Sequence, residues 1–566
     1  MKTSAWLFRN PRKTGTAASE SRTTPTTGCA LGAPRKQPTS SCSDSWRAAA
    51  PFALLICAGL CGAANFGIDP HALLDPLSKD WPTFNGDYSG RRYSSLSQIN
   101  QTNVTKLTVA WVAQPESVGI KSTPLEVNGI LYFTTPDNVW AADARSGQTI
   151  WHFFRQSTGD HIGNRGVGMY KDFLYFETPD CHLIALDAKS GKVRWNVELA
   201  DPKLAYFATM SPLIIRDHVI VGVSGDATDV PGFLESVEPE TGKVQWRWNT
   251  EPKPGEPGSE TWPQGTDAIL HGGGMTWMTG TYDPELNQLY WGTGNPNPVL
   301  NGDIRKGANL YTCSIVALNP DSGKLVWYYQ PSPHDTHDWD AVQTPVLIND
   351  DVNGVHRKLL AQASRNGFFF LLDRTTGEHI ATAPFVESNW SKGLNAKGEP
   401  IENPAKEPKP DGTLVSPGSD GATNWMAPSF DPDSKLFYFS GRRLWSIFYM
   451  TAEGKPEGWA GRDRNLWSNS FVSAIDYKTG ETKWRHEIGD GEGSTGMLTT
   501  AGKLLFTGDN SNNLLALDPA TGKTLWHVRL GARMLTAPTT YELDGKQYLL
   551  VPSGNILFAW TLPDGE

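Results

Sequence analysis

Apolar and polar positions along the chain repeat one short pattern seven times. Each copy has a small or apolar pair, an acidic or amide residue, three further residues and a glycine, and most copies have a tryptophan four positions later. The apolar residues predict a half-buried strand, the turn residues adopt a tight turn at low steric cost, and the tryptophan starts the returning strand. The copies are Ala141–Trp151, Ala185–Trp195, Ser236–Trp246, Ala317–Trp327, Leu371–Ala381, Ala474–Trp484 and Ala516–Trp526.

The spacing of these copies predicts a β-propeller. The shortest gaps between the turn glycines are 44 and 42 residues, which match a four-stranded blade of roughly 40–50 residues. Trp81 near the start and an apolar segment at 556–562 indicate an eighth blade closed by both termini. We therefore predict an all-β, eight-bladed β-propeller in which tryptophans pack between blades. Leu371–Ala381 should be a true strand pair, because its turn is intact although the tryptophan is missing.

The first 64 residues differ from the repeat region. They are basic and rich in Ser and Thr, and they end in an apolar run over residues 48–64 that is short for a membrane span. Arg47 before this run and the small residues 62–64 at its end are typical of a secretory signal, with an uncleaved anchor as the alternative. We predict a periplasmic or secreted protein without an integral membrane domain after cleavage. The expected segments are a leader with signal peptide (1–64), a linker (65–80), the propeller (81–562) and a tail (563–566).

Charge and cysteine content narrow the classes of partner. The net charge of −10 becomes −16 when the eight Lys/Arg and two Asp/Glu of residues 1–64 are left out, which argues against nucleic acid or an anionic membrane surface. Four of the six cysteines lie in that leader. Cys181 and Cys313 remain, and two cysteines do not make a disulfide framework. No Cys-x-x-Cys-His motif for covalent haem attachment occurs.

Five segments outside the repeat carry a specific resemblance. They are Trp81–Leu107, Gly272–Trp277, Tyr290–Pro298, Ser332–Asp340 and Gly421–Pro432. Together they resemble the pyrroloquinoline quinone (PQQ) dependent alcohol dehydrogenases, which are periplasmic eight-bladed propellers that hold PQQ and a metal ion on the propeller axis. The resemblance runs from about residue 81 to residue 562. It implies oxidation of a small alcohol, with electrons passing to an external cytochrome c or another acceptor because the chain has no haem motif of its own.

The resemblance also assigns a cofactor site. PQQ is a flat ortho-quinone with three carboxylates, so its site needs an apolar plate, cations or hydrogen-bond donors, and a metal ion that polarises the reactive carbonyl. Trp277 matches the plate, Arg165 the partner of a carboxylate, and Arg365 the group at the quinone oxygens. A core tryptophan and structural inter-blade cations are the alternatives for these three. The matching hydrogen-bond donors are Thr209, Ser224 and Asn424.

Three further residues match positions of the family that bind the metal or act as the catalytic base. Asn295 matches a metal ligand, and Asp338 matches the catalytic base that takes the alcohol proton while hydride passes to the quinone. Asp340 occupies the position of the extra acid in lanthanide-using members, and in an extended segment it would point to the same side as Asp338. The implied ion is Ca²⁺ or a lanthanide held by these three residues, with a polar loop tip as the alternative for Asp340. His334 and His337 have zinc-like spacing, but no third ligand is evident.

Three positions depart from the family pattern. The metal-ligand Glu falls on Ala227, the paired cysteines whose disulfide ring covers the cofactor fall on Gly159 and Asp160, and an acid of the PQQ pocket falls on Lys121. Two functions of different class follow. The first is a periplasmic quinoprotein alcohol dehydrogenase, which the axial segments favour. The second is a cofactor-free propeller that acts as a binding or assembly scaffold, which the missing ligand and disulfide favour.

Overall fold

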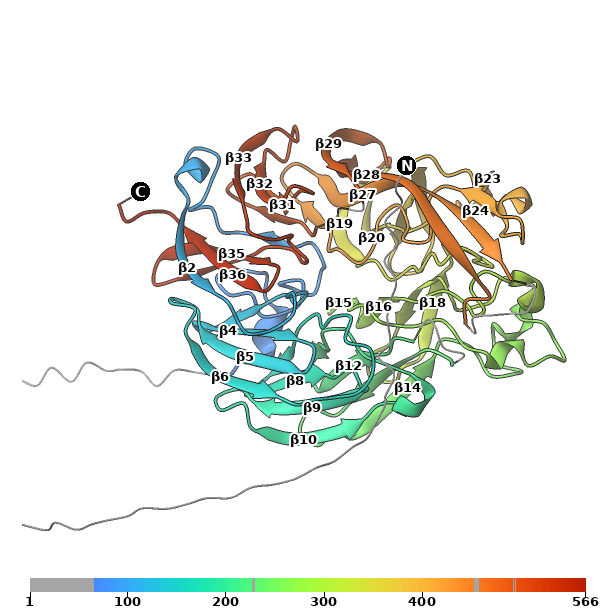
Figure 1. The fold of residues 1–566 in the computed structure, drawn as a ribbon, viewed down its shortest axis with the longest axis horizontal. Helices are drawn as coiled ribbons and strands as arrows, with labels where there is room; N and C mark the ends of the chain where they lie inside the picture. The colour runs from blue at the N-terminus through green and yellow to red at the C-terminus, as the bar shows by residue number, and fades with distance from the viewer. Residues whose placement is uncertain (1–65, 226–229, 452–457, 492, 494, 566) are drawn as a thin grey trace, which may run out of the picture. The chain divides into compact units, whose positions relative to one another are not determined.

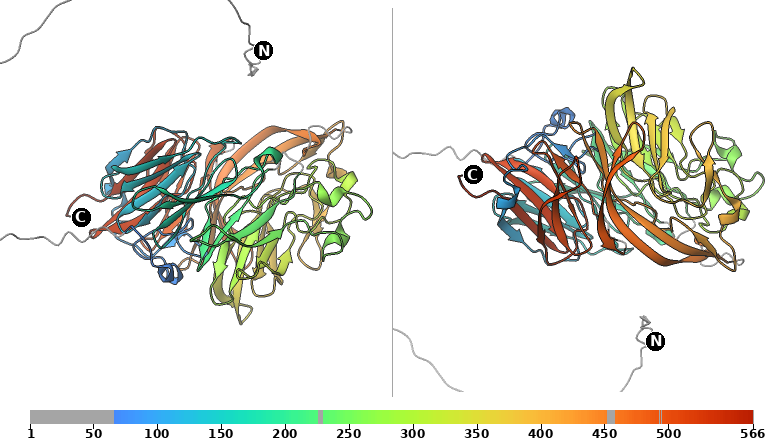
Figure 2. Two further views of the ribbon diagram at one scale, coloured as in Figure 1. Left: turned by 90° about the horizontal axis from the view of Figure 1, so that it is seen from below. Right: turned by 90° about the horizontal axis from the view of Figure 1, so that it is seen from above.

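A computed structural model describes residues 66–225, 230–451, 458–491, 493 and 495–565 of the chain. The predicted leader and the departure at Ala227 lie outside these residues. The regular secondary structure of the described part consists of strands, as expected, together with short 3-10 helices (Figures 1 and 2). None of its helices has the length and apolar character needed to cross a membrane. The 3-10 helices are η1 (Pro70–Leu74), η2 (Val104–Lys106), η3 (Pro202–Leu204), η4 (Ser259–Thr261), η5 (Ala268–Leu270), η6 (Gly302–Arg305) and η7 (Pro404–Lys406).

Five successive antiparallel sheets of four strands form the first part of the fold. Each sheet is a meander in which neighbouring strands are consecutive in the chain. Short local turns set most of the registers, while longer connections join β12 to β13 and β16 to β17. The strands are β3 (Leu125–Val127), β4 (Ile130–Thr135), β5 (Asn138–Asp143) and β6 (Thr149–Phe154); β7 (Gly168–Tyr170), β8 (Phe173–Glu177), β9 (His182–Asp187) and β10 (Val193–Glu198); β11 (Leu213–Ile215), β12 (His218–Gly222), β13 (Phe233–Val237) and β14 (Val244–Asn249); β15 (Thr281–Asp283), β16 (Gln288–Gly292), β17 (Ile315–Leu318) and β18 (Leu325–Tyr329); β19 (Val346–Val352), β20 (Val355–Ala363), β21 (Phe368–Asp373) and β22 (His379–Pro384).

Three more large sheets follow, and a small hairpin precedes them. Within the sixth large sheet, β27 and β28 are much longer than the other strands and remain paired over their whole length (Figure 1). The strands are β23 (Ser391–Leu394) and β24 (Pro400–Glu402) of the hairpin; β25 (Thr413–Val415), β26 (Ser429–Asp431), β27 (Leu436–Met450), β28 (Gly461–Asp476) and β29 (Thr482–Asp490); β1 (Tyr93–Ser94), β30 (Leu498–Thr500), β31 (Leu504–Gly508), β32 (Asn513–Leu517) and β33 (Thr524–Arg529); β2 (Thr108–Ala113), β34 (Thr539–Leu543), β35 (Lys546–Ser553) and β36 (Ile556–Thr561).

The two ends of the described chain meet in the last two sheets. Strand β1 pairs in parallel with β30. Strand β2 pairs antiparallel with β36, with Thr108 opposite Thr561, and Figure 1 shows β2 beside β36. Trp81 is fully buried in an apolar cluster with residues of β30 to β33, β35 and β36. These pairings cover strand edges that would otherwise be exposed, and they tie the start of the chain to its end.

Five of the six repeat tryptophans dock on the turn glycine of the following repeat. The Trp151 indole packs on Gly191, where an added Cβ would lie only 2.6 Å from the ring, and its Nε1 donates a hydrogen bond to the Ala188 carbonyl at 3.0 Å. Gly191 has a φ of +67°, which glycine adopts without steric cost. The glycine therefore provides both the turn and the room for the ring. The same docking joins Trp111 to Gly147, Trp195 to Gly242, Trp246 to Gly323, Trp327 to Gly377 and Trp484 to Gly522.

The copy without a tryptophan is a regular strand pair, which confirms the prediction. Leu371 in β21 lies opposite Ala381 in β22, as Ala141 lies opposite Trp151 in the first copy. The following turn glycine, Gly480, packs against the methyl group of Ala383 instead of an indole. Ala381 packs against an apolar cluster that is rich in phenylalanine. Other side chains thus provide the packing in this sheet.

The docking contact makes a testable prediction. Gly191→Ala should lower the free energy of unfolding by about 1–3 kcal/mol more than Gly354→Ala, because only the first methyl group overlaps an indole ring. Gly354 is a matched control, since its φ is +78° and an added Cβ would meet no atom within 4 Å. Denaturant unfolding of the two variants measures the difference. Equal losses in both would show that the contact with Trp151 adds nothing to the backbone cost.

Candidate functional site

The residues predicted for the site all lie at the same end of their sheets, beyond the strand termini. Each of them either precedes the first strand of a four-stranded meander or follows its second strand, and in an antiparallel meander these two positions lie at the same end. The repeat turns, between the third and fourth strands, lie at the opposite end. The residues are Arg165 before β7, Thr209 before β11, Ser224 after β12, Trp277 before β15, Asn295 after β16, Asp338 and Asp340 before β19, Arg365 after β20 and Asn424 before β26.

A buried ion-pair cluster lies at the centre of this set. The Arg365 guanidinium donates through Nη1 to Asp340 Oδ2 at 2.6 Å and through Nη2 to Asp338 Oδ2 at 2.9 Å. Its Nη2 also donates to the Ser419 carbonyl at 2.7 Å. The side chains of Arg365, Asp338 and Asp340 are only 6%, 12% and 1% exposed. Charge-assisted hydrogen bonds with so little solvent contact fix the geometry of all three groups.

Asp340 connects several of the predicted residues. Besides Arg365, its Oδ2 accepts a hydrogen bond from Trp277 Nε1 at 3.1 Å, and its Oδ1 accepts one from the Asn295 backbone N–H at 2.8 Å. Burial raises the pKa of Asp340, while Arg365 and these hydrogen bonds oppose the rise. Asp338 and Asp340 contact the same guanidinium. The segment that carries them is not extended, since Asp338 has a φ of +68°. The expected extended geometry is therefore wrong in detail.

The three glycines before Trp277 allow two backbone segments to meet. Gly272, Gly273 and Gly274 have φ values of +88°, +111° and +64°. A Cβ on Gly273 would lie 2.4 Å from the Asn295 carbonyl oxygen, and Gly274 N–H donates to that same oxygen at 2.7 Å. Side chains here would force the segments apart. The triplet thus places the Trp277 indole and Asn295 against the same carboxylate.

Arg165 lies over two indole rings. Its guanidinium carbon is 4.8 Å from the ring centroid of Trp277 and 4.8 Å from that of Trp425. The Arg165 Nη1 donates to the Thr209 hydroxyl and, at 3.2 Å, to the Thr209 carbonyl, and the Thr209 hydroxyl lies 3.4 Å from the Ser224 hydroxyl. Sequence reasoning did not single out Trp425. The available signal was its position directly after Asn424 in a segment that carries the resemblance.

The side-chain amide of Asn424 forms hydrogen bonds within the loop that carries Trp425. Its Oδ1 accepts a hydrogen bond from the Trp425 backbone N–H at 2.8 Å, and its Nδ2 donates to the Asp420 carbonyl at 3.1 Å. The contacts described above bring the predicted residues from Arg165 to Arg365 together, and Asn424 joins them through its neighbour Trp425. Their roles toward a cofactor or metal stay predictions.

The segment where the family has its disulfide ring leaves no room for a side chain at Gly159. Gly159 has a φ of +92°, and a Cβ there would lie 2.4 Å from the Pro179 carbonyl oxygen. The neighbouring His161 ring is held 2.8 Å from Asp137 Oδ2. Asp160 is exposed. A cysteine at position 159 would therefore require the backbone to move, so the missing disulfide is built into the local fold.

Lys121, the position with reversed charge, lies beside this segment. Its Nζ donates to the Ile162 carbonyl, and burial together with the charge of Arg165 lowers its pKa. A Cβ on Gly163 would lie 2.7 Å from Lys121 Cδ, so the lysine stem packs tightly against that glycine. Lys121 thus adds positive charge near Arg165.

The two histidines of the His-x-x-His sequence have structural partners. His337 is buried, stacks on Trp339 at a centroid distance of 4.3 Å, and has a ring Nε2 that lies 3.0 Å from the Lys406 carbonyl. His334 Nδ1 lies 2.8 Å from the Gly307 carbonyl. Burial lowers the pKa of each to about 4. Across the described ranges, no group of three His, Cys, Asp or Glu side chains is arranged to hold a metal ion, so the zinc interpretation gains no support.

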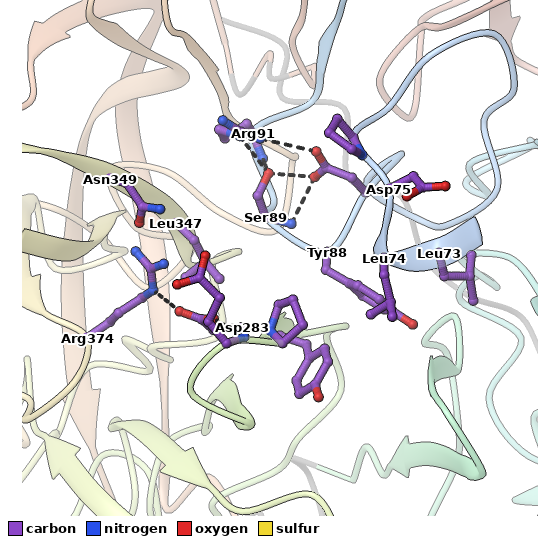
Figure 3. A pocket seen from close by; sticks show the side chains of 15 residues that line it. Leu73, Leu74, Asp75, Tyr88, Ser89, Arg91, Asp283, Leu347, Asn349 and Arg374 are labelled. Atoms are coloured by element: carbon purple, nitrogen blue, oxygen red, sulfur yellow. Dashed lines mark hydrogen bonds and ion pairs between the residues drawn. The ribbon is translucent and has the colours of Figure 1, made fainter. Parts of the chain in front are cut away.

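A separate pocket of about 230 Å³ lies elsewhere on the protein (Figure 3). Its wall includes Tyr88, Arg91, Asp283 and Arg374, and Arg374 Nε donates to Asp283 Oδ2 at 2.7 Å. Asp283 ends β15, at the end of the sheet opposite to Trp277. None of the predicted site residues lines this pocket, so it is distinct from the candidate site.

The repeated four-stranded sheets are those of a β-propeller. The cluster of indole, guanidinium and carboxylate groups at one end of the strands is its candidate site. The family model of the glucose/ethanol/alcohol dehydrogenase β-propeller domain, which is named for PQQ, matches residues 81–399. A model of the outer membrane protein assembly factor BamB matches residues 468–566.

Individual relatives cover most of the chain. The quinoprotein alcohol dehydrogenase PedH of Pseudomonas putida is 35% identical over 538 residues, which cover 88% of this chain and 90% of that protein. The crystal structure of the quinohemoprotein alcohol dehydrogenase of Comamonas testosteroni matches with a TM-score of 0.84 at 32% identity, over 88% of this chain and 83% of that one. A europium-containing methanol dehydrogenase matches with a TM-score of 0.80 at 28% identity, over 86% and 98%. The chain belongs to the family of PQQ-dependent quinoprotein alcohol dehydrogenases.

Proposed function

We propose that the protein is a periplasmic quinoprotein that oxidises a small alcohol with PQQ and a hard cation, and passes electrons to a separate cytochrome c or another acceptor. The observation that carries the proposal is the buried Arg365 guanidinium, which bridges Asp338 and Asp340 beside the Trp277 indole. Relatives named as quinoprotein alcohol dehydrogenases support the reaction class. The apolar run at 48–64 supports export.

We also infer that the eight sheets of four or five strands are the eight blades of one closed propeller. The docking of five repeat tryptophans on the next turn glycine, from Trp151 on Gly191 to Trp484 on Gly522, supports a succession of blades. The pairing of β2 with β36 supports closure by both ends of the chain. A closed ring explains why site residues spread over about 260 positions meet at one end of the sheets.

The side chains present fit PQQ in chemical type. Trp277 offers an apolar face, and Arg165 and Arg365 offer guanidinium groups that suit carboxylate and quinone oxygens. The hydroxyls of Thr209 and Ser224 lie next to Arg165 and add hydrogen-bonding capacity. When bound, PQQ would supply the two-electron acceptor that these residues lack.

The residues predicted to bind the metal also fit in chemical type, although Arg365 pairs with two of them. Asn295, Asp338 and Asp340 offer the oxygen donors that Ca²⁺ and lanthanides prefer. Arg365 already neutralises both carboxylates, so a cation at this position would have to share them with the guanidinium. In the proposed reaction the Asp338 carboxylate takes the proton of the alcohol hydroxyl, while Asp340 holds Trp277 and Arg365 in place.

Reconstitution tests this function directly. Protein lacking residues 1–64 is mixed with PQQ and either Ca²⁺ or La³⁺, and the absorption of bound quinone and alcohol-dependent dye reduction are measured. We expect both signals with at least one of the ions. Failure to bind PQQ with either ion would overturn the proposal. It would favour the cofactor-free scaffold. The observation that supports this alternative is Gly159, where the backbone leaves no room for a Cβ and therefore none for the family's disulfide ring.

A further inference from the structure

The Trp425 indole and the Trp277 indole both lie against one planar group. The guanidinium carbon of Arg165 is 4.8 Å from each ring centroid, and Trp425 packs against the same apolar cluster that contains Trp277. A guanidinium is flat and delocalised, like an aromatic layer, and it stacks on indole faces. Both rings therefore lie within stacking distance of the same flat group.

The Trp425 loop is fixed to the centre of the site. Its backbone N–H is held by Asn424, and Arg442 donates to the Asp420 and Gly421 carbonyls at 2.8 and 3.0 Å. Gly421 has a φ of +76°, and a Cβ there would lie 2.7 Å from Arg365 Cβ. The loop thus packs directly on Arg365, so the Trp425 ring has a set position relative to the ion-pair cluster.

Gly159 and Asp160 stand where the family has its disulfide ring, and neither offers a flat side chain there. Gly159 has no room for a Cβ, and Asp160 next to it is exposed. Trp277 alone would cover only one face of a flat cofactor. Trp425 is half-buried, with its ring against Arg165 and part of its surface in solvent, which is a suitable position for the outer wall of a cofactor site.

We propose that Trp425 is the second aromatic plate of the cofactor site and takes the place of the absent disulfide ring. This inference rests on the proposed function. Trp277 and Trp425 would cover the faces of the planar quinone, and Arg165, which lies near both rings, would pair with one of its carboxylates. Stacking on both faces favours binding by dispersion and by exclusion of water from the quinone. Trp425 is a binding residue for the cofactor and has no part in the proton transfer.

Quinone binding by three variants tests the inference. PQQ is titrated by equilibrium dialysis, with Ca²⁺ or La³⁺, into wild type, Trp425→Phe, Trp425→Leu and Trp425→Ala, and the absorption band of bound quinone is recorded. Trp425→Phe keeps an aromatic face and should bind within about threefold of wild type, whereas the Leu and Ala variants should bind about tenfold more weakly. Their quinone band should also move toward that of free PQQ. Trp467→Ala is the control, because Trp467 is 48% exposed in β28 and should leave binding unchanged.

The outcomes separate the two proposals. Wild-type protein that fails to bind PQQ overturns the proposed function and the plate together. Wild type that binds, with Leu and Ala variants that bind equally well and show the same band, overturns the plate alone. Trp425→Leu keeps apolar bulk in the loop, so it carries the test if Trp425→Ala does not fold. Circular dichroism of each variant establishes that the fold is kept.

Discussion

Asp338→Asn is expected to lower the rate of alcohol-dependent dye reduction by about 10²–10⁴-fold, because an amide cannot accept the alcohol proton. Asparagine is the appropriate replacement, since it keeps the shape of the side chain and tolerates the φ of +68° at this position. The rate is measured with saturating PQQ and metal, and quinone binding is followed by absorption. Loss of turnover with quinone still bound would identify Asp338 as the base.

A matched control for this substitution is Asp544→Asn. Asp544 also has a positive φ, +53°, but it lies in the exposed turn between β34 and β35, where its partner is Arg145. The same chemical change there should leave turnover unchanged. An Asp338→Asn variant that keeps the wild-type rate would exclude Asp338 as the base, whatever its position beside Arg365.

The sheet architecture could be predicted because its determinants are local. Each repeat carries its own turn residues, its own glycine and its own tryptophan, and the structure uses these for strand pairing and for docking between neighbouring sheets. The long arms of β27 and β28 and the hairpin β23–β24 were not predicted. They fall in the long gap between the turn glycines Gly377 and Gly480, where the repeat gives no periodic signal.

The residues of the candidate site came from family resemblance, and the contacts among them could not be read from the sequence. Asp340 was expected as a metal ligand, but its hydrogen bonds to Trp277 and Arg365 depend on how connections from separate sheets meet. Trp425 was missed for the same reason. Its role follows from Arg165, some 260 residues earlier in the chain. Long-range contacts of this kind leave no spacing pattern in the sequence.

Asp340→Ala is expected to lower the free energy of unfolding by about 3–5 kcal/mol, the largest effect on stability that we predict. The substitution removes the partner of Arg365 Nη1, Trp277 Nε1 and the Asn295 backbone N–H at once. Arg365 would remain buried with Asp338 as its nearest carboxylate. A buried charge that loses a partner cannot recover its hydration, so most of the lost interaction energy remains uncompensated.

Glu487→Ala is the matched control for the stability measurement. Glu487 also pairs with an arginine through two hydrogen bonds, but the side chains of Arg443 and Glu487 are 34% and 50% exposed. Solvent screens that pair, so its loss should cost about 0–1 kcal/mol. Denaturant unfolding of both variants without cofactor or metal gives the two values. A loss at Asp340 no larger than that at Glu487 would show that Arg365 finds another partner, and that the bridged carboxylate pair does not hold the strand ends together.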